Sequence, residues 1–96
     1  MEIKIEFIGI LTIYDIFPVG VHPYIFPGDT VMDLLADLTT KQGTKMRESL
    51  FDERTGELDS TIQVQLNGTY LNNIKLFSQN VKQGDKITFL RLLMGG

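Results

Sequence analysis

The alternation of apolar and charged residues near the start of the chain predicts its first β-strand. Ile3, Ile5 and Phe7 alternate with charged residues at positions 2, 4 and 6, which is the period of a strand with one buried face. The alternation breaks at Ile8-Gly9, where we expect a bulge or the end of strand pairing. Residues 10–20 are apolar but include a proline and a glycine, and we predict a long turn over them.

Two further segments before the last strand have the character of strands. Residues 21–26 are expected to return antiparallel to the first strand, and Pro23 places them at a sheet edge because proline has no amide hydrogen to donate. Residues 62–66 alternate again and are followed by Asn67-Gly68, a pair typical of a tight hairpin turn. A short strand near residues 70–74 should therefore pair back.

A helix-start signal and an apolar stripe predict one main helix. The segment PGDT, residues 27–30, offers an N-cap at Asp29 or Thr30, and Thr30 has the spacing of a capping box with Asp33. Four apolar residues then recur at the i, i+3, i+4, i+7 spacing of one helix face, namely Val31, Leu34, Leu35 and Leu38. Because Gly43 is typical of a C-terminal stop, we predict a helix over residues 30–42.

The order of these elements predicts an α+β fold. Strand, strand, helix, strand, short strand and strand make a mixed four- to five-stranded sheet with one main helix packed on one face, a β-grasp-like arrangement. The polar segment 44–60 should be a loop in which Leu50 and Phe51 hold a short helical turn. Residues 1–96 are expected to form one domain. The residues assigned to its core are Phe7, Val31, Leu34, Leu35, Leu38, Val64, Leu66 and Phe89.

Composition and charge exclude several classes of protein. No apolar run approaches the ~20 residues that a membrane helix needs, and the charged, alternating N-terminus is unlike a secretory signal, so we expect a cytoplasmic protein. The chain has no cysteine and one histidine, which excludes disulfides, thiolate ligands, a cysteine nucleophile and a multi-histidine metal site. With a net charge of −3 and no lysine–arginine cluster, nucleic acid is not an expected partner. We expect no bound metal or cofactor.

The chain ends in RLLMGG, and its last two residues, Gly95 and Gly96, are the main candidates for function. Glycine has no Cβ, so a Gly-Gly end is thin enough to enter a narrow channel and adopts backbone angles denied to other residues. A carboxylate is a poor electrophile, but an enzyme that joins it to AMP from ATP makes it an acyl donor. A sulfur nucleophile then gives a thiocarboxylate, whereas an amine gives an amide. A flexible tail without a function is the alternative.

The last strand carries a candidate surface for partner enzymes. We expect this strand to run to about residue 92 or 93, with Ile87 and Phe89 on the face toward the helix. Leu90, Leu92 and Met94 then share the opposite face, and an exposed apolar row is a candidate docking surface. The alternative is a central strand that is buried on both sides.

Other polar residues have weaker claims to a function. Arg91, beside the apolar row, could pair with an acid on a partner or be a solvated strand charge. His22 is expected to be structural or solvent-facing, because a catalytic base needs a partner and the sequence shows no serine or cysteine nucleophile arranged for one. The acids between residues 47 and 59 are expected to form a solvated loop, with complementarity to a basic activating enzyme as the alternative.

Several motifs together resemble the MoaD/ThiS family of ubiquitin-like sulfur carriers over nearly the whole chain. They are IKIEFIG at the start, PGDTVMDLLADL opening the helix, IQVQLNG in the middle hairpin and VKQGDKITFL before the terminal GG. The segment MRESLFDERTGEL is similar to the longer middle segment of the MoaD and ubiquitin-related-modifier members.

The resemblance implies a β-grasp fold and a cytoplasmic carrier without catalysis of its own. It implies that a separate activating enzyme uses ATP to adenylate Gly96, which then becomes a thiocarboxylate, and that Gly95 and Gly96 enter first this enzyme and later the sulfur-accepting enzyme. In the MoaD branch the acceptor is the large subunit of molybdopterin synthase. In other branches it is thiazole synthase, a tRNA thiolation enzyme or a lysine of a protein.

Two departures from the family pattern keep the acceptor open. MoaD-like chains usually carry a PPV-type segment before the terminal glycines, whereas this chain has RLLMGG. Their first loop often contains LRE, where this chain has LTIYDIFPVG. Both departures weaken the assignment to molybdopterin synthase, but neither affects the carrier chemistry. A sulfur carrier, with molybdopterin synthesis as its first expected pathway, is the first hypothesis. A ubiquitin-like modifier that joins Gly96 to lysines is the second, and a plain β-grasp interaction module is the third.

Overall fold

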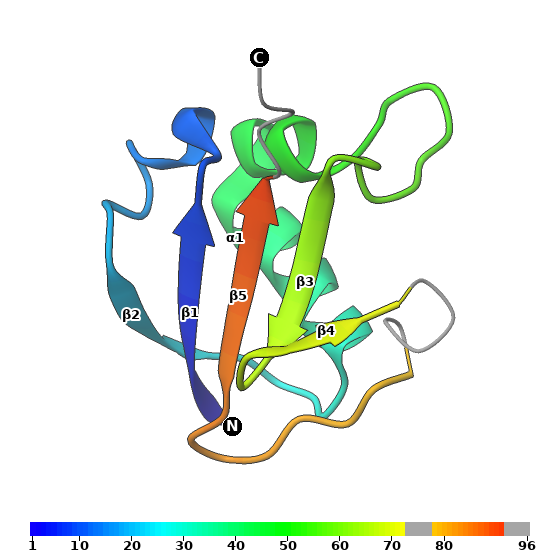
Figure 1. Ribbon diagram of the computed structural model, residues 1–96. Helices are drawn as coiled ribbons and strands as arrows, with labels where there is room; N and C mark the ends of the chain where they lie inside the picture. The colour runs from blue at the N-terminus through cyan, green and yellow to red at the C-terminus, as the bar shows by residue number, and fades with distance from the viewer. Residues whose placement is uncertain (73–77, 92–96) are drawn as a thin grey trace.

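The structure, a computed structural model, describes residues 1–72 and 78–91 of the chain. Its elements are strands β1 (Glu2–Ile8) and β2 (Val21–Ile25), helix α1 (Val31–Leu50), and strands β3 (Ile62–Leu66), β4 (Thr69–Leu71) and β5 (Lys86–Arg91), with a short 3-10 helix η1 (Leu11–Ile13) before β2. In Figure 1, α1 crosses behind one face of the sheet. The predicted order of elements is confirmed.

The five strands form one mixed sheet in the order β2-β1-β5-β3-β4. β5 lies at its centre, parallel to β1 and antiparallel to β3. β2 pairs antiparallel with β1 on one side, and β4 pairs antiparallel with β3 on the other. A parallel pair cannot be joined by a tight hairpin, and α1 lies within the long connection that separates β1 from β5. The first and last strands therefore meet side by side in the middle of the sheet.

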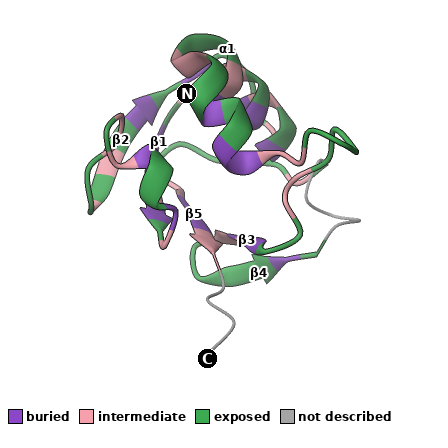
Figure 2. Cartoon of the chain, turned by 90° about the horizontal axis from the view of Figure 1, so that it is seen from above, coloured by how far each residue is buried: buried purple, intermediate pink, exposed green. Residues whose placement is uncertain are grey.

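The core lies between α1 and the facing side of the sheet. The helix stripe is buried as predicted, and Figure 2 shows the buried side of α1 turned toward the strands. Phe89 at the centre of β5 is fully buried and stacks on Phe7 of β1, with ring centroids 5.0 Å apart. Leu66 is the exception among the predicted core residues, because it packs against the core but is only partly buried.

Residues 10–20 contribute more to the core than the predicted long turn implies. Gly9, at the end of β1, has a φ of +75°, and the chain then enters η1, where Ile10 and Ile13 are fully buried. The Tyr14 hydroxyl accepts from the Gly9 amide at 3.1 Å and donates to the Phe7 carbonyl at 3.2 Å. The prediction of a long turn was therefore wrong for residues 11–13, which form a short 3-10 helix at one end of the core.

The edge position of β2 is confirmed, and Pro23 suits it. Phe26 donates to the Met1 carbonyl at 3.0 Å, so by the alternation of an antiparallel ladder the amides of residues 22 and 24 also point toward β1. The amide position of Pro23 then points away from β1, where no partner strand is paired. A proline there removes a donor from the open edge, which disfavours pairing with another chain.

The start of α1 has the predicted capping box. The Thr30 hydroxyl accepts from the Asp33 amide at 3.1 Å, and the Asp33 carboxylate accepts from the amides of Thr30 at 3.2 Å and Asp29 at 3.0 Å. The hydrogen bonds from these amides and from the Thr30 hydroxyl hold the pKa of Asp33 below its ordinary value. At neutral pH the Thr30 hydroxyl and the ionised Asp33 carboxylate therefore accept from the amides of Asp33 and Thr30, which would otherwise lack partners at the start of the helix.

Helix α1 continues past the predicted stop at Gly43. Gly43 has φ +78° and ψ −156°, which kinks the helix, but the chain resumes helical geometry and ends at Leu50. Met46, Ser49 and Leu50 are buried, and their i, i+3, i+4 spacing continues an apolar face after the kink. The prediction of a loop with one short helical turn was wrong here, because burial of this second face outweighs the polar composition of the segment.

Replacing Gly43 with alanine is expected to destabilise the protein by about 1–3 kcal/mol. A Cβ at this position would meet no atom within 4 Å, so the cost comes from the positive φ, which alanine rarely adopts. Urea unfolding followed by circular dichroism measures the change. Thr44→Ala, at the exposed next residue, is the matched control and should change the free energy of unfolding by less than about 0.5 kcal/mol. Equal effects of the two variants would contradict the strained kink.

The predicted hairpin turn is also present. Asn67 has a φ of +50°, and its side chain donates to the Asp85 carboxylate at 2.9 Å and accepts from the Lys86 amide at 2.8 Å. These bonds tie the β3–β4 turn to the start of β5. β4 begins at Thr69, one residue before the predicted start of the short strand, and the predicted residues 73 and 74 lie outside the described residues.

Candidate functional site: the end of strand β5

The central strand β5 leads directly to the candidate tail. Arg91 is its last described residue, and Leu92, Met94, Gly95 and Gly96 lie outside the described residues. β1 and β5 are parallel, so both strands finish at the same end of the sheet. In Figure 1, η1 (the blue turn above β1) and the end of α1 also lie at this end of the sheet. Strand β5 therefore ends in the middle of the sheet, close to the end of β1, to η1 and to the end of α1.

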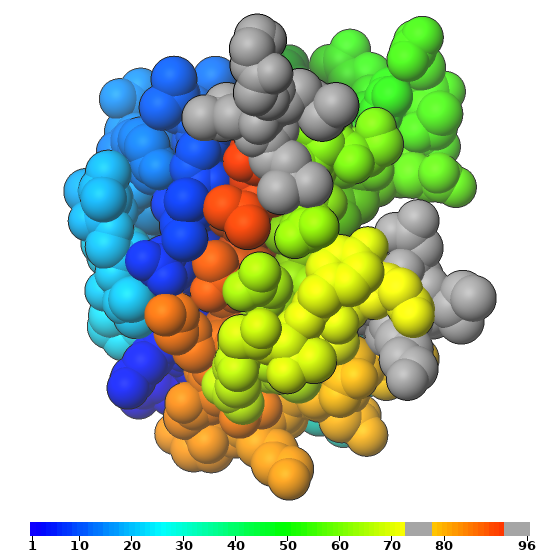
Figure 3. Space-filling view, viewed as in Figure 1, coloured from blue at the N-terminus to red at the C-terminus, as the bar shows by residue number. Residues whose placement is uncertain are grey.

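Leu90 lies on the face of the sheet away from α1, as predicted. It pairs with Ile8 on β1 and Gln63 on β3, and paired residues share a face of the sheet. Leu90 is half-buried, while the Ile8 side chain is 42% exposed. The two alternatives for the last strand, an exposed apolar row and burial on both faces, therefore each hold in part, because Leu90 is partly covered and partly exposed. Figure 3 views this face, with β5 in orange-red between β1 and β3.

One apolar residue beside Leu90 was missed by the sequence analysis. Ile8 pairs with Leu90 at the last paired position of β1 and is 42% exposed. The sequence showed only that the alternation of the first strand breaks at Ile8-Gly9, which gives no sign of its neighbour on the last strand. We name Ile8 and Leu90 the docking patch, because adjacent exposed apolar side chains are a candidate partner surface.

The rest of the outer face is not uniformly polar. Lys86 of β5 forms an ion pair with Glu6 of β1 at 3.1 Å. The outer strands add exposed apolar residues to the same face, namely Val21 and Ile25 of β2 and Tyr70 of β4. The docking patch is therefore distinguished from them by its place where β1 and β5 end, next to the start of the candidate tail.

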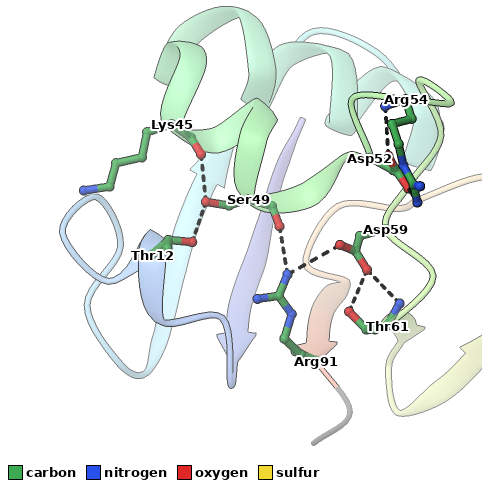
Figure 4. Close-up of polar contacts among 8 residues, drawn as sticks. All are labelled: Thr12, Lys45, Ser49, Asp52, Arg54, Asp59, Thr61 and Arg91. Carbon is green, nitrogen blue, oxygen red and sulfur yellow. Dashed lines mark hydrogen bonds and ion pairs between the residues drawn. The ribbon is translucent and has the colours of Figure 1, made fainter.

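Arg91 does not project freely toward solvent. Its Nη2 atom donates to the Ser49 carbonyl at 3.4 Å and lies 3.8 Å from a carboxylate oxygen of Asp59. Figure 4 shows the guanidinium between the end of α1 and the loop that follows it. The expectation of a solvated strand charge was wrong, since the side chain is only 30% exposed. Pairing of Arg91 with an acid on a partner stays an untested prediction.

The acidic segment is ordered by bonds of its own. Asp59 accepts from the Thr61 hydroxyl at 2.6 Å and the Thr61 amide at 2.8 Å. These two bonds, and more weakly the positive charge of Arg91, hold the pKa of Asp59 below its ordinary value. The Arg54 amide and side chain similarly lower the pKa of Asp52. The segment is therefore a structured acidic loop, and a contact with an activating enzyme stays a prediction.

The described residues show no catalytic arrangement around His22. The ring Nε2 lies 2.5 Å from the Pro18 carbonyl, and the ring lies 5.7 Å from that of Phe17, so the histidine holds the turn before β2. In the described ranges no three side chains of the histidine, cysteine, aspartate or glutamate type gather as metal ligands would. Over residues 1–72 and 78–91, no helix has the length and apolar character that a membrane span requires.

A groove lies between the outer side of α1 and the loop that follows it. It has a volume of about 470 Å³, and Phe51 and the stems of Arg47 and Glu48 contribute to its lining. Its acidic residue with a lowered pKa, Asp52, is paired with Arg54. No acid–base pair with opposed pKa shifts converges on it among the described residues, so it lacks the features of an active site.

Comparison with known proteins identifies the fold. No family model and no curated protein matches the sequence. Among solved structures, the small archaeal modifier protein 1 of Haloferax volcanii matches with a TM-score of 0.74 at 20% identity, covering 100% of both chains. CysO of Mycobacterium tuberculosis matches with a TM-score of 0.70 at 17% identity, covering 95% of this chain and 99% of its own.

A third neighbour comes from a two-protein complex. It belongs to the complex of subunits 1 and 2 of molybdopterin-converting factor from Helicobacter pylori, with a TM-score of 0.59, 21% identity and 100% coverage of both chains. A CysO of Amycolatopsis orientalis is likewise known in a complex with BexX. These likenesses extend over the whole arrangement of sheet and helix. The chain has the β-grasp fold of ubiquitin-like proteins, and the MoaD/ThiS resemblance is thereby confirmed at the level of the fold.

Proposed function

We propose that this chain, residues 1–96, is a ubiquitin-like sulfur carrier of the MoaD/ThiS type, with no catalysis of its own. The observation that carries the proposal is the Gly95-Gly96 pair placed five residues or fewer beyond the central strand of a β-grasp body. Strand β5 is held on both sides by other strands, so the body serves as a rigid handle for the tail. The terminal glycines have no side chain to obstruct an active-site channel.

The proposed chemistry takes place at the carboxylate of Gly96. A carboxylate oxygen attacks the α-phosphorus of ATP in a partner enzyme, the bond to pyrophosphate breaks, and an acyl-adenylate forms. Hydrosulfide then attacks the acyl carbon, AMP leaves with the carbon–oxygen bond electrons, and a thiocarboxylate remains. The chain has no cysteine, so the sulfur carried is held on the chain end and not on a thiol of the protein.

Two partner enzymes follow from this chemistry. The first is an adenylating activating enzyme of the ubiquitin-activating type, and the second accepts the sulfur. The complex of subunits 1 and 2 of molybdopterin-converting factor from Helicobacter pylori favours an acceptor such as the large subunit of molybdopterin synthase. We place the protein in the cytoplasm, where it acts without nucleic acid or membrane. Carriers for thiamine thiazole synthesis or tRNA thiolation would use the same tail with a different acceptor.

A second function, protein modification, is favoured by a separate observation. The structural match with the small archaeal modifier protein 1 of Haloferax volcanii extends over 100% of both chains. In a modifier the same acyl-adenylate reacts with the amine of a lysine and yields an isopeptide bond. The two functions share the activation step and differ only in the nucleophile.

Replacing Leu90 with lysine is expected to weaken binding to the activating enzyme about tenfold or more, since the loss of a hot-spot residue in an interface costs about 2 kcal/mol or more. The stem of lysine can lie on the half-buried surface, so the fold should persist. Isothermal titration calorimetry measures the binding constant. Gln65→Lys, opposite Thr88 on the same face and outside the docking patch, is the matched control and should bind normally. Unfolding of the Leu90 variant would instead assign Leu90 to the core.

The function is tested by incubating the full chain with a purified ubiquitin-activating-type enzyme from the same organism, ATP and sulfide. Intact-mass measurement should show that one oxygen is replaced by sulfur. In cells, a tagged chain should be recovered with this same change and without lysine adducts. A ladder of lysine adducts would overturn the carrier in favour of the modifier. No change of either kind would leave only a β-grasp interaction module.

A further inference from the structure

Arg91 occupies a position that an ordinary surface arginine would not. It is the last residue of β5 and lies five positions before Gly96, and only 30% of its side chain is exposed. Its Nε atom is buried and has no hydrogen-bond partner among residues 1–72 and 78–91. Burying an unpaired N–H costs free energy, and such exceptions are uncommon in folded proteins. The sequence therefore places a cation here at a cost that a solvent-facing arginine would avoid.

The guanidinium lies at the C-terminal end of α1. Ser49 is in the last turn of the helix, where backbone carbonyls lack intrahelical donors. Arg91 donates to this carbonyl at 3.4 Å, and a positive charge is favoured at the negative end of a helix. The Ser49 hydroxyl bonds to Thr12 of η1 at 2.6 Å, which links the same helix turn to the end of β1. The base of the tail is thus tied to the helix through one side chain.

The carboxylate beside Arg91 is itself held in place. Asp59 is fixed by both bonds from Thr61, and its amide donates to the Leu50 carbonyl at 2.8 Å. Its oxygen lies 3.8 Å from Arg91 Nη2. Asp59 therefore offers a stationary negative charge, and Figure 4 shows both contacts of Arg91 converging from different elements.

The backbone of Arg91 is confined from the opposite side. A Cβ built on Gly9 would lie 3.1 Å from the Arg91 carbonyl oxygen, so the end of β1 passes this carbonyl closely. The same residue pairs with Ile62 of β3. Both the main chain and the side chain of Arg91 are therefore held by neighbouring residues.

We propose that Arg91 is a positioning residue that fixes the end of β5, and with it the point from which the chain continues to Gly96. The proposal rests on the proposed function, because it concerns how the carboxyl end is presented to the activating enzyme. In general, a chain end explores fewer orientations beyond a fixed strand end than beyond a frayed one. Fixing the end of β5 therefore lowers the entropy that must be lost when the terminal carboxylate is aligned for reaction.

The first test needs only the chain itself. Arg91→Met keeps the length of the side chain and removes the charge, while Asp59→Asn keeps an oxygen for Thr61 and removes the charge that faces Arg91. We expect both to lower the amide heteronuclear NOE of Leu92 and Leu93 in nitrogen-15 relaxation measurements. Arg54→Met is the matched control, since Arg54 pairs with Asp52 at 3.5 Å while its side chain is 89% exposed, and it should leave both values unchanged.

The second test measures charging by the activating enzyme of the functional assay. Arg91→Met and Asp59→Asn should lower kcat/KM for adenylation about tenfold or more, at a temperature where every variant is folded, and Arg54→Met should not. A purely structural role would lower the thermal midpoint without changing kcat/KM or the NOE values. Unchanged values in both folded variants would overturn the positioning role. Failure of the wild-type chain to be charged would overturn the proposed function. The NOE test would still decide whether Arg91 fixes the end of β5.

Discussion

Replacing Gly96 with phenylalanine is expected to lower the rate of charging at the chain end by at least about 100-fold. A displacement of about 1 Å at a reacting group can reduce a rate by this factor, and a benzyl group beside the reacting carboxylate displaces it further or bars it from the channel. Pyrophosphate exchange with the activating enzyme measures the effect. Met94→Leu keeps both glycines and serves as the control, with a rate close to that of the wild type.

Deletion of Gly96 should have a similar effect for a different reason. The chain would still end in glycine, but its carboxylate would be withdrawn by about 3.3–3.6 Å, the span of one extended residue. The free energy of unfolding should be unchanged in both variants, because neither changes a residue of the sheet or of α1. Normal charging of both would show that the enzyme does not act on an unhindered carboxylate at this distance from β5.

Replacing Phe89 with alanine is expected to destabilise the fold by about 3–5 kcal/mol. The side chain is fully buried, stacks on Phe7 and lies on the central strand, so its removal leaves a cavity that cannot readily collapse. Since a domain is stabilised by only about 5–15 kcal/mol, the variant should lose a large part of its stability. Urea denaturation followed by circular dichroism gives the difference.

The matched comparison for Phe89 is Leu11→Ala. Leu11 is 76% exposed, so its truncation should change the free energy of unfolding by less than about 0.5 kcal/mol. Similar losses of stability in the two variants would contradict the assignment of core and surface.

Local patterns predicted the parts of the fold that depend on local chemistry. The period of β1, the capping box at Thr30 and the Asn67-Gly68 turn are set by neighbouring residues and were all confirmed. The stripe of α1 was confirmed for the same reason. Gly43 was misread because glycine usually ends a helix, whereas here it kinks one whose second part is retained by buried residues.

The candidate site depends on contacts that local patterns do not encode. Arg91 meets Ser49, 42 positions earlier in the chain, and no periodicity relates these two residues. Ile8 looked like the end of a strand, yet its pairing with Leu90 places it in the docking patch. The predicted roles of Leu92, Met94, Gly95 and Gly96 rest on the sequence and the resemblance, because these residues lie outside the described ranges.

The central claim is that the carboxylate of Gly96 is the reacting group of this protein. Fragmentation mass spectrometry of the full chain, after reaction with activating enzyme, ATP and sulfide, tests it most directly. We expect every fragment that contains Gly96 to carry one sulfur in place of one oxygen, and every fragment that lacks Gly96 to be unchanged. Sulfur gained at any other position, or an unmodified chain end under conditions in which the enzyme consumes ATP, would contradict the claim.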